Sequence, residues 1–257
     1  MKLLIAVPSG GNASKPFLES LESLELPPEV SAVENSTVLG NFVPAQRELL
    51  ARRAMEKGAD VMLMIDDDMV LPAATIAKLL AALTADERVG LVGALYYTRD
   101  GIRPMVADGW EARNTTKSWI PAFRQGRVDD VSAVGLGCAL IRVDALRAMR
   151  PPIFAGQVYI EEAAGRVRIC NEDFVLCERL GKLGYSVKLH AGVRCGHYDR
   201  ASGLTLPLIW ESDTVTDRAR MMVVEPGPRY SLVPHTPDLG TVRERHEMAS
   251  LEYLFVD

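Results

Sequence analysis

The sequence contains no apolar stretch long enough to cross a bilayer, because a membrane-spanning helix needs about 20 consecutive apolar residues. Residues 1–8 form an apolar run with one charge, which is too short for a signal peptide or a membrane span. We interpret this run as the first core strand. We therefore expect a cytoplasmic protein that is at most peripheral to a membrane.

Closely spaced cysteines and an excess of basic residues are also missing. The four cysteines are scattered and include no C-x-x-C pair, so the sequence indicates neither structural zinc nor a redox motif. We interpret them as reduced thiols. The formal net charge of -5 argues against a protein whose main function is to bind the nucleic acid backbone, although it does not exclude a local basic groove.

The chain of 257 residues has no internal repeat, low-complexity segment or long run of like charge. Its contents of 48% hydrophobic and 25% charged residues are those of an ordinary globular protein. Strand and helix patterns alternate from the first residue to about His190, which predicts an α/β fold with a mostly parallel central sheet flanked by helices. We expect one domain over residues 1–200. Residues 201–257 would form a C-terminal arm that packs on the body or on a partner subunit, and the second arrangement would make a homo-oligomer.

One apolar run, residues 61–65, leads into three consecutive carboxylates, Asp66, Asp67 and Asp68. Five apolar residues without polar alternation are typical of a strand that is buried on both faces. Adjacent carboxylates repel one another, so such a cluster needs cations, either a metal ion or Arg and Lys side chains. Ligands of open α/β sheets bind beyond the carboxyl ends of the strands. We interpret the acids as a functional cluster, with a polar loop after a core strand as the alternative.

The first predicted strand is followed by a turn of small residues, Pro8-Ser9-Gly10-Gly11-Asn12. A backbone of this kind allows close approach by a ligand, although a plain strand-to-helix turn remains the alternative. A phosphate-binding Walker loop is excluded, because Lys15 lacks the preceding Gly and the following Ser or Thr. The acidic run is therefore not expected to be a Walker B strand.

A helix is predicted to begin at Pro44 and to run to about Lys57, with Leu49, Leu50 and Ala54 on its buried side. Arg47 lies near its amino end, where a cation gains nothing from the helix dipole. A phosphate or carboxylate partner would explain this position, and a solvated surface arginine is the alternative.

The other elements are predicted from the spacing of apolar residues and from the positions of proline and glycine. Apolar residues at helical spacing predict a helix that opens at Pro72 and buries Ile76, Leu79, Leu80 and Leu83. Two glycines in the strand predicted over residues 131–141 indicate a bulge or close approach by a ligand. The remaining predictions are a helix over 17–26, strands over 30–38 and 89–97, a helix over 143–149, and a mobile loop up to Cys170 that carries Glu161 and Glu162.

Residues 98–129 show few clear periods, which is typical of a functional loop or an inserted β element. This segment contains Trp110, Trp119 and several arginines. Tryptophan and arginine together suit stacking on a sugar or a base. A tryptophan buried under a loop is the alternative.

Asn171, Glu172 and Asp173 precede apolar residues at helical spacing and a terminal Gly184, which predicts a well-capped helix. Capping alone would explain the acids, but Asp173 near a helix start is also rigidly placed to point a carboxylate into a cleft. A final strand is predicted over residues 185–190. His197 follows it on a loop and is a candidate metal ligand.

Four separated pieces of the sequence together resemble the GT-A fold glycosyltransferases, especially family-two-like enzymes of the nucleotide-diphospho-sugar transferase superfamily. The pieces are the Pro-Ser-Gly turn, the Asp run at 66–68, the Gly135-x-Gly137-Cys138-Ala139 segment and the Asn171-Glu172-Asp173 helix start. The resemblance covers about residues 1–200 and implies a single GT-A-type domain. It also implies a hexosyltransferase-like enzyme that uses a nucleoside-diphosphate sugar as donor.

The resemblance further implies roles for individual residues. In its Asp-x-Asp motif, Asp68 binds Mn²⁺ or Mg²⁺, Asp66 faces the nucleoside, and Asp67 contacts the sugar or only shapes the turn. His197 matches a histidine that completes the metal site in some members. Pro8, Ser9 and Arg47 would lie beside the nucleotide. Asp173 would be the general base of an inverting transfer to an acceptor hydroxyl, and Glu172 would instead take that part or bind the acceptor.

The chain departs from the family in one respect, since the usual Gln-x-x-Arg-Trp motif after the base is not recognisable and Trp210 is only a loose substitute. Acceptor binding and any link to processive synthases are thereby left open. A glycan, a lipid-linked sugar, a small metabolite, a protein side chain and a modified nucleic acid base all remain candidate acceptors. The alternatives to a glycosyltransferase are a nucleotidyltransferase that makes nucleotide sugars and a non-catalytic sugar-nucleotide-binding protein.

Overall fold

The computed structural model describes residues 1–111, 119–120, 123, 126–161, 166–207 and 220–221. The chain divides into two units, Met1–Met222 and Val223–Asp257, and the second unit lies outside the described residues. Most of the predicted C-terminal arm, including Trp210, therefore also lies outside them. Among the described residues, no helix has the length and apolar character that a membrane crossing requires.

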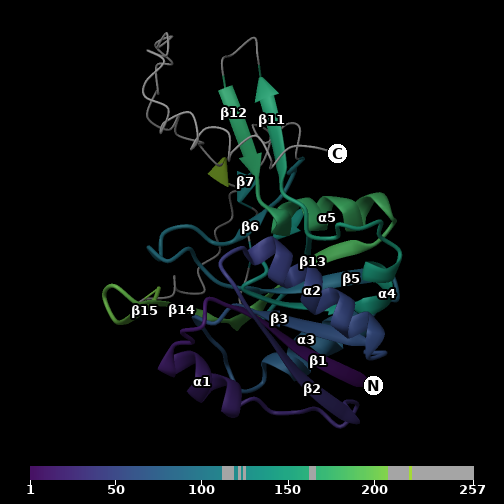
Figure 1. Cartoon of the computed structure of the whole chain (residues 1–257), viewed down its shortest axis with the longest axis vertical. Helices are drawn as coiled ribbons and strands as arrows, with labels where there is room; N and C mark the ends of the chain where they lie inside the picture. Colours follow the sequence, from purple (N-terminus) through teal and green to yellow (C-terminus); the bar gives the residue numbers. More distant parts are fainter. Residues whose placement is uncertain (112–118, 121–122, 124–125, 162–165, 208–219, 222–257) are drawn as a thin grey trace, which may run out of the picture. The chain divides into compact units, whose positions relative to one another are not determined.

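A seven-stranded sheet forms the centre of the first unit (Figure 1). β1 runs parallel to β2 and β3, β13 runs parallel to β5, and β10 lies antiparallel between β3 and β5, so five strands share one direction. The predicted α/β fold with a mostly parallel sheet is confirmed. In sheet order, the strands are β2 (Ala32–Leu39), β1 (Lys2–Ser9), β3 (Val61–Ile65), β10 (Cys138–Arg142), β5 (Val89–Leu95), β13 (Ser186–Arg194) and β8 (Val128–Val131).

Helices cover both faces of this sheet. Leu4 and Ala6 of β1 belong to a core with the side chains of α2 (Val43–Glu56), α4 (Val143–Arg147) and α5 (Glu172–Lys182). Leu3 and Ile5 belong to the opposite core, with α1 (Lys15–Glu22) and α3 (Thr75–Thr84). Because alternate residues of a strand point to opposite faces, β1 is buried on both sides, as its continuous apolar sequence predicts.

The prediction for the buried side of α2 was wrong at Leu49, which is 41% exposed, whereas Leu50 and Ala54 are fully buried. Neighbouring helical residues point about 100° apart, while residues four positions apart share a face. Leu50 and Ala54 therefore lie together on the sheet side of the helix, and Leu49 does not.

Two predictions for the middle of the chain need correction. The predicted mobile loop before Cys170 contains a hairpin of β11 (Gln157–Glu161) and β12 (Arg166–Cys170), which pair in antiparallel register. The strand predicted over residues 131–141 is broken into the end of β8, the short β9 (Ala133–Val134), a turn and β10. β-branched residues in both strands favour the pairing of the hairpin, and Glu162 lies outside the described residues. The two glycines of the apolar run, Gly135 and Gly137, lie in the turn between β9 and β10.

The remaining pairings are short. β14 (Gly196–Asp199) lies between β15 (Leu204–Leu206) and β4 (Met69–Val70). β6 (Val106–Ala107) pairs with β9, and β7 (Trp119–Ile120) pairs with β16 (Arg220–Met221). The first of these sheets matters most for function, because it joins the strand after the acidic triplet to the strand that carries His197.

Candidate functional site

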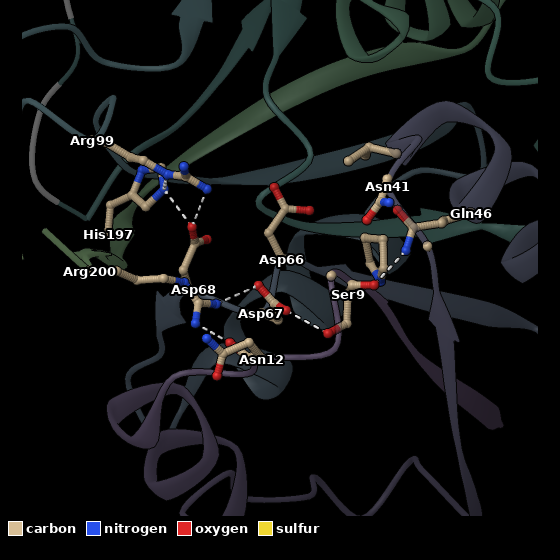
Figure 2. A pocket seen from close by; sticks show the side chains of 14 residues that line it. Ser9, Asn12, Asn41, Gln46, Asp66, Asp67, Asp68, Arg99, His197 and Arg200 are labelled. Carbon is tan, nitrogen blue, oxygen red and sulfur yellow. Dashed lines mark hydrogen bonds and ion pairs between the residues drawn. The ribbon is translucent and has the colours of Figure 1, made fainter.

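A cavity of about 440 Å³ lies where β1, β2 and β3 end. This volume is within the range of about 300–1,000 Å³ that is common for small-molecule sites. The carboxyl ends of parallel strands meet at one edge of a sheet, which explains why residues far apart in sequence share the cavity. Its lining consists of Pro8, Ser9, Gly10, Asn12, Gly40, Asn41, Val43, Gln46, Asp66, Asp67, Asp68, Arg99, His197 and Arg200 (Figure 2).

The acidic triplet is held in a fixed turn directly after β3. The Asp66 N–H donates to the carbonyl of Gly137, and the Met69 N–H donates to the carbonyl of Asp66. The carbonyl of Asp68 accepts a 2.7 Å hydrogen bond from the N–H of Tyr198. The backbone is therefore tied on both sides, and the three carboxylates point in different directions (Figure 2).

Each carboxylate of the triplet has its own arginine. Arg47 Nη2 lies 2.7 Å from Asp66 Oδ1, and Arg200 Nη2 lies 3.1 Å from Asp67 Oδ1. Arg99 Nη2 lies 2.6 Å from Asp68 Oδ2. The sequence leaves open whether a metal ion or basic side chains offset these charges, and arginines do so at all three positions.

Asp67 joins the triplet to the turn after β1. Ser9 Oγ donates to Asp67 Oδ2 at 2.5 Å and accepts from the N–H of Gly11 at 3.0 Å. Gly11 has a φ of +87°, a left-handed conformation that favours glycine. Arg200 also donates to the carbonyl of Asn12. The turn and the acids thus form one connected wall of the cavity.

Asp68 and His197 face one another beneath Arg99 (Figure 2). His197 Nε2 is 3.4 Å from Asp68 Oδ2, and its Nδ1 is 2.9 Å from the carbonyl of Tyr97. Burial favours neutral Asp68, but His197 and Arg99 outweigh it and lower the pKa of Asp68. Burial likewise opposes the charged imidazole, yet Asp68 and the Tyr97 carbonyl leave the pKa of His197 raised.

These two side chains are the candidate metal ligands, and their chemistry suits a divalent ion. Donation from Nδ1 to a backbone carbonyl leaves Nε2 free as a ligand, an arrangement common to metal-binding histidines. Two ligands each about 2.1 Å from an octahedral ion lie about 3 Å apart when adjacent, close to the observed separation. The described residues contain no group of three or more His, Cys, Asp or Glu arranged for a metal.

Arg47 is buried, with 4% of its surface exposed, so the solvated-surface alternative was wrong. Besides Asp66, its guanidinium binds Glu172, with Nη1 2.5 Å from Oε1. Burial favours loss of the proton, but Asp66, Glu172 and Asp173 together raise the pKa of Arg47. The position of Arg47 near the helix start indicated an anionic partner, and the structure provides two carboxylates, Asp66 and Glu172.

Asp173 lies in the first turn of α5 and is 8% exposed. Its Oδ1 accepts a 2.8 Å hydrogen bond from the N–H of Phe174. Burial is the main cause that raises the pKa of Asp173 to about 6, with Arg47 acting in the opposite direction. Asn171 stands at the N-cap but makes no side-chain capping bond.

The structure thus brings most of the predicted site residues together, in two groups. Pro8, Ser9, His197 and the acidic triplet line the cavity. Arg47, Glu172 and Asp173 do not line it, and Arg47 links Glu172, the neighbour of Asp173, to Asp66.

Sequence reasoning missed several residues of the site. Arg99 follows the end of β5 and could have been found by the same strand-end rule that identified the Asp run. Gln46 donates to the carbonyls of Ser9 and Val38 and so ties the ends of β1 and β2 together. No local pattern distinguishes Gln46 or Arg200 from other polar residues.

The tryptophans and glycines have structural explanations where they are described. Trp110 is 8% exposed and packs edge-on against Phe174, with ring centroids 5.4 Å apart. The glycines were predicted to mark a bulge or close approach by a ligand. A Cβ at Gly135 would lie 2.0 Å from Tyr96 Oη, so the group that comes close there is a tyrosine of the chain itself. The side chain of Trp119 lies outside the described residues.

Two solved structures are similar to this chain over about three quarters of its length. A197 from STIV has a TM-score of 0.54 at 20% identity, and the alignment covers 77% of this chain and 86% of that chain. GalNAc-T7 with UDP, GalNAc and Mn²⁺ has a TM-score of 0.51 at 12% identity, covering 76% of this chain and 43% of that chain. At these identities the likeness shows a GT-A-like fold. No protein-family model and no curated protein matches the sequence.

Proposed function

We propose that this protein is a metal-dependent, inverting glycosyltransferase that moves a sugar from a nucleoside-diphosphate sugar to an acceptor hydroxyl. One observation carries the proposal. The Asp66-Asp67-Asp68 triplet lines a cavity at the strand ends together with His197, and Arg47 connects it to the first turn of α5. The GT-A-like fold supports it, as does a structural neighbour that was solved with UDP, GalNAc and Mn²⁺.

The donor would occupy the cavity beside Pro8, Ser9 and Asp66. Asp66 would accept from the ribose, since its side chain is 33% exposed while Arg47 holds the opposite side. Asp67 is fully engaged with Ser9 and Arg200, which favours a role in shaping the turn. Arg99 and Arg200 line the same cavity and would attract the diphosphate.

Asp68 and His197 would hold Mn²⁺ or Mg²⁺, and Arg99 must leave Asp68 for this to happen. When bound, a divalent cation supplies charge neutralisation to the departing diphosphate. The chain's own contribution is to keep Asp68 ionised and to fix the tautomer of His197 through Tyr97.

Asp173 would act as the general base. It would take the proton of the acceptor hydroxyl as that oxygen bonds to the anomeric carbon and the bond to the diphosphate breaks, which inverts the carbon. A pKa of about 6 is close to the operating pH, where a carboxylate base works well. Glu172 is engaged with Arg47, which leaves Asp173 as the better candidate.

A screen by thermal shift tests the donor site. We expect one of the UDP-, GDP- and dTDP-sugars to stabilise the protein in the presence of Mn²⁺, and Asp68→Ala to abolish that response. The absence of any nucleotide response with every metal would contradict the proposal. A nucleotidyltransferase would instead release pyrophosphate from a nucleoside triphosphate and a sugar phosphate.

A second experiment separates donor binding from transfer. Asp173→Asn should keep the nucleotide-dependent thermal shift and lose transfer to the acceptor by at least about 100-fold, the scale of general base catalysis. Retained transfer would remove Asp173 as the base. A non-catalytic binding protein would bind the nucleotide and show no transfer in the unmodified chain.

A further inference from the structure

We propose that Arg47 is a positioning residue that connects the donor side of the site to the acceptor side. Its guanidinium holds Asp66 at the end of β3 and Glu172 in the first turn of α5, and so fixes the place and the charge of Asp173. This inference rests on the proposed function, because it assigns a role to the residue that controls the proposed base.

The geometry of Arg47 makes it a bridge. Its two terminal nitrogens bind two carboxylates that are 106 positions apart in sequence, at 2.7 Å and 2.5 Å. Its Nε is buried without a hydrogen-bond partner in the part of the chain that the structure describes. Among the described residues, the two ion pairs therefore provide all the side-chain hydrogen bonds of this guanidinium. Loss of either carboxylate would remove one of the two.

The charges around Arg47 explain why Asp173 is the carboxylate whose protonation depends most on this arginine. Three carboxylates, Asp66, Glu172 and Asp173, act on this one buried cation. Arg47 binds the first two directly, whereas Asp173 accepts a hydrogen bond from the Phe174 N–H. Buried like charges cannot all stay ionised at low cost, so the carboxylate without an ion pair takes up a proton first.

The groups that face Asp173 come from α2, from α5 and from the residues that follow β3 and β5. Arg47 on α2 favours its ionised form, while Glu172 on α5 and Asp66 after β3 oppose it. The buried Tyr96 phenol, directly after β5, and the Cys177 thiol of α5 also lie within the electrostatic reach of Asp173. Burial and Asp173 raise the pKa of both groups, and Asp66 also raises the pKa of Tyr96. Arg47 is thus the one positive group in this set, and it counteracts burial at the proposed base.

The test measures the protonation of Asp173 directly, by infrared titration of the protonated carboxyl band that Asp173→Asn removes. Arg47→Met should shift the midpoint upward by at least about one pH unit, a 10-fold change in proton affinity. Glu172→Gln should shift it downward, because one negative neighbour disappears. Arg47→Lys should keep the midpoint near that of the unmodified protein, since the charge remains, yet lower kcat/KM, since a single ammonium cannot bridge both carboxylates.

Arg52→Met is the matched control, because Arg52 lies on the same helix, is largely exposed and pairs with Glu48 outside the site. It should leave the midpoint unchanged. Unchanged midpoints in folded Arg47→Met and Glu172→Gln would overturn the proposal, as would shifts of the same sign. If Arg47→Met does not fold, Arg47→Gln takes its place, because it removes the same charge and should also shift the midpoint upward. The titration needs no donor, so a protein without transferase activity would refute the proposed function while the midpoint shifts would still test the role of Arg47.

Discussion

Without any ligand, the Asp68 carboxylate is already paired with a cationic side chain, that of Arg99. Arg99 Nη2 lies 2.6 Å from Asp68 Oδ2, and Arg99 Nε lies 3.4 Å from His197 Nε2. One guanidinium therefore touches both proposed metal ligands. Because the Arg99 side chain is 67% exposed, it can move into solvent or onto a bound phosphate without disturbing the core.

This arrangement predicts that Arg99 competes with a metal ion. Arg99→Ala should strengthen Mn²⁺ binding to the nucleotide-free protein by about 10-fold, because the ion no longer has to displace a charge partner worth about 1.4 kcal/mol. Electron paramagnetic resonance of free Mn²⁺ measures the affinity. Arg103→Ala, on the same loop but outside the cavity, should change nothing. Equal or weaker binding in Arg99→Ala would show that Arg99 does not occupy the metal position.

Among the structural elements, the loop between β9 and β10 and the helix α5 set the positions of the two halves of the site. The β9–β10 turn supplies the Gly137 carbonyl that holds Asp66, and its two glycines leave room for the ring and hydroxyl of Tyr96. Tyr96 Oη accepts from the N–H of Gly137. Helix α5 carries Glu172 and Asp173 in its first turn, where the helix dipole favours carboxylates.

Two glycine substitutions should therefore act in opposite directions. Gly135→Ala places a methyl group 2.0 Å from Tyr96 Oη and should cost about 1–3 kcal/mol of unfolding free energy. Gly181→Ala lies in α5 with open space around it and should add about 0.5–1 kcal/mol, because alanine favours the helix. Urea unfolding measures both. Equal effects would contradict the close packing of Tyr96 on the β9–β10 turn.

The stability of the protein as a whole should depend on the charge of Asp173. The pKa of this buried carboxyl is raised from 3.8 to about 6. A raised pKa means that its favourable contribution is complete below about pH 4 and is lost as the pH rises through 6. At neutral pH the folded protein therefore carries a buried charge at a cost of up to about 3 kcal/mol.

Asp173→Asn should consequently stabilise the protein at pH 7–8 by about 1–3 kcal/mol while abolishing transfer, since the amide removes the charge and still accepts from Phe174. The gain should vanish below about pH 4. Chemical unfolding at several pH values measures it, with Asp144→Asn, an exposed acid of α4, as control. A gain that does not depend on pH would disprove the link to ionisation.

The sheet and the location of the acids could be predicted from the amino-acid sequence. Continuous apolar runs at residues 3–7, 61–65 and 89–95 specify strands buried on both faces, and helical spacing specifies the cover of each face. The strand-end rule then puts Asp66, Asp67 and Asp68 at a ligand cavity. These sequence patterns are local, because the burial of a strand and the periodicity of a helix both depend on residues that are close together in the chain.

The pairing of charges could be read only from the folded chain. For Arg47 the sequence left both a solvated surface position and a phosphate or carboxylate partner open, and it contained no pattern that marked Arg99 or Arg200. Their pairing with the triplet depends on how α2, β5 and β14 are placed beside the end of β3, which brings together side chains separated by 19, 31 and 133 positions. An ion pair depends on distance in space, and a single sequence records only distance along the chain.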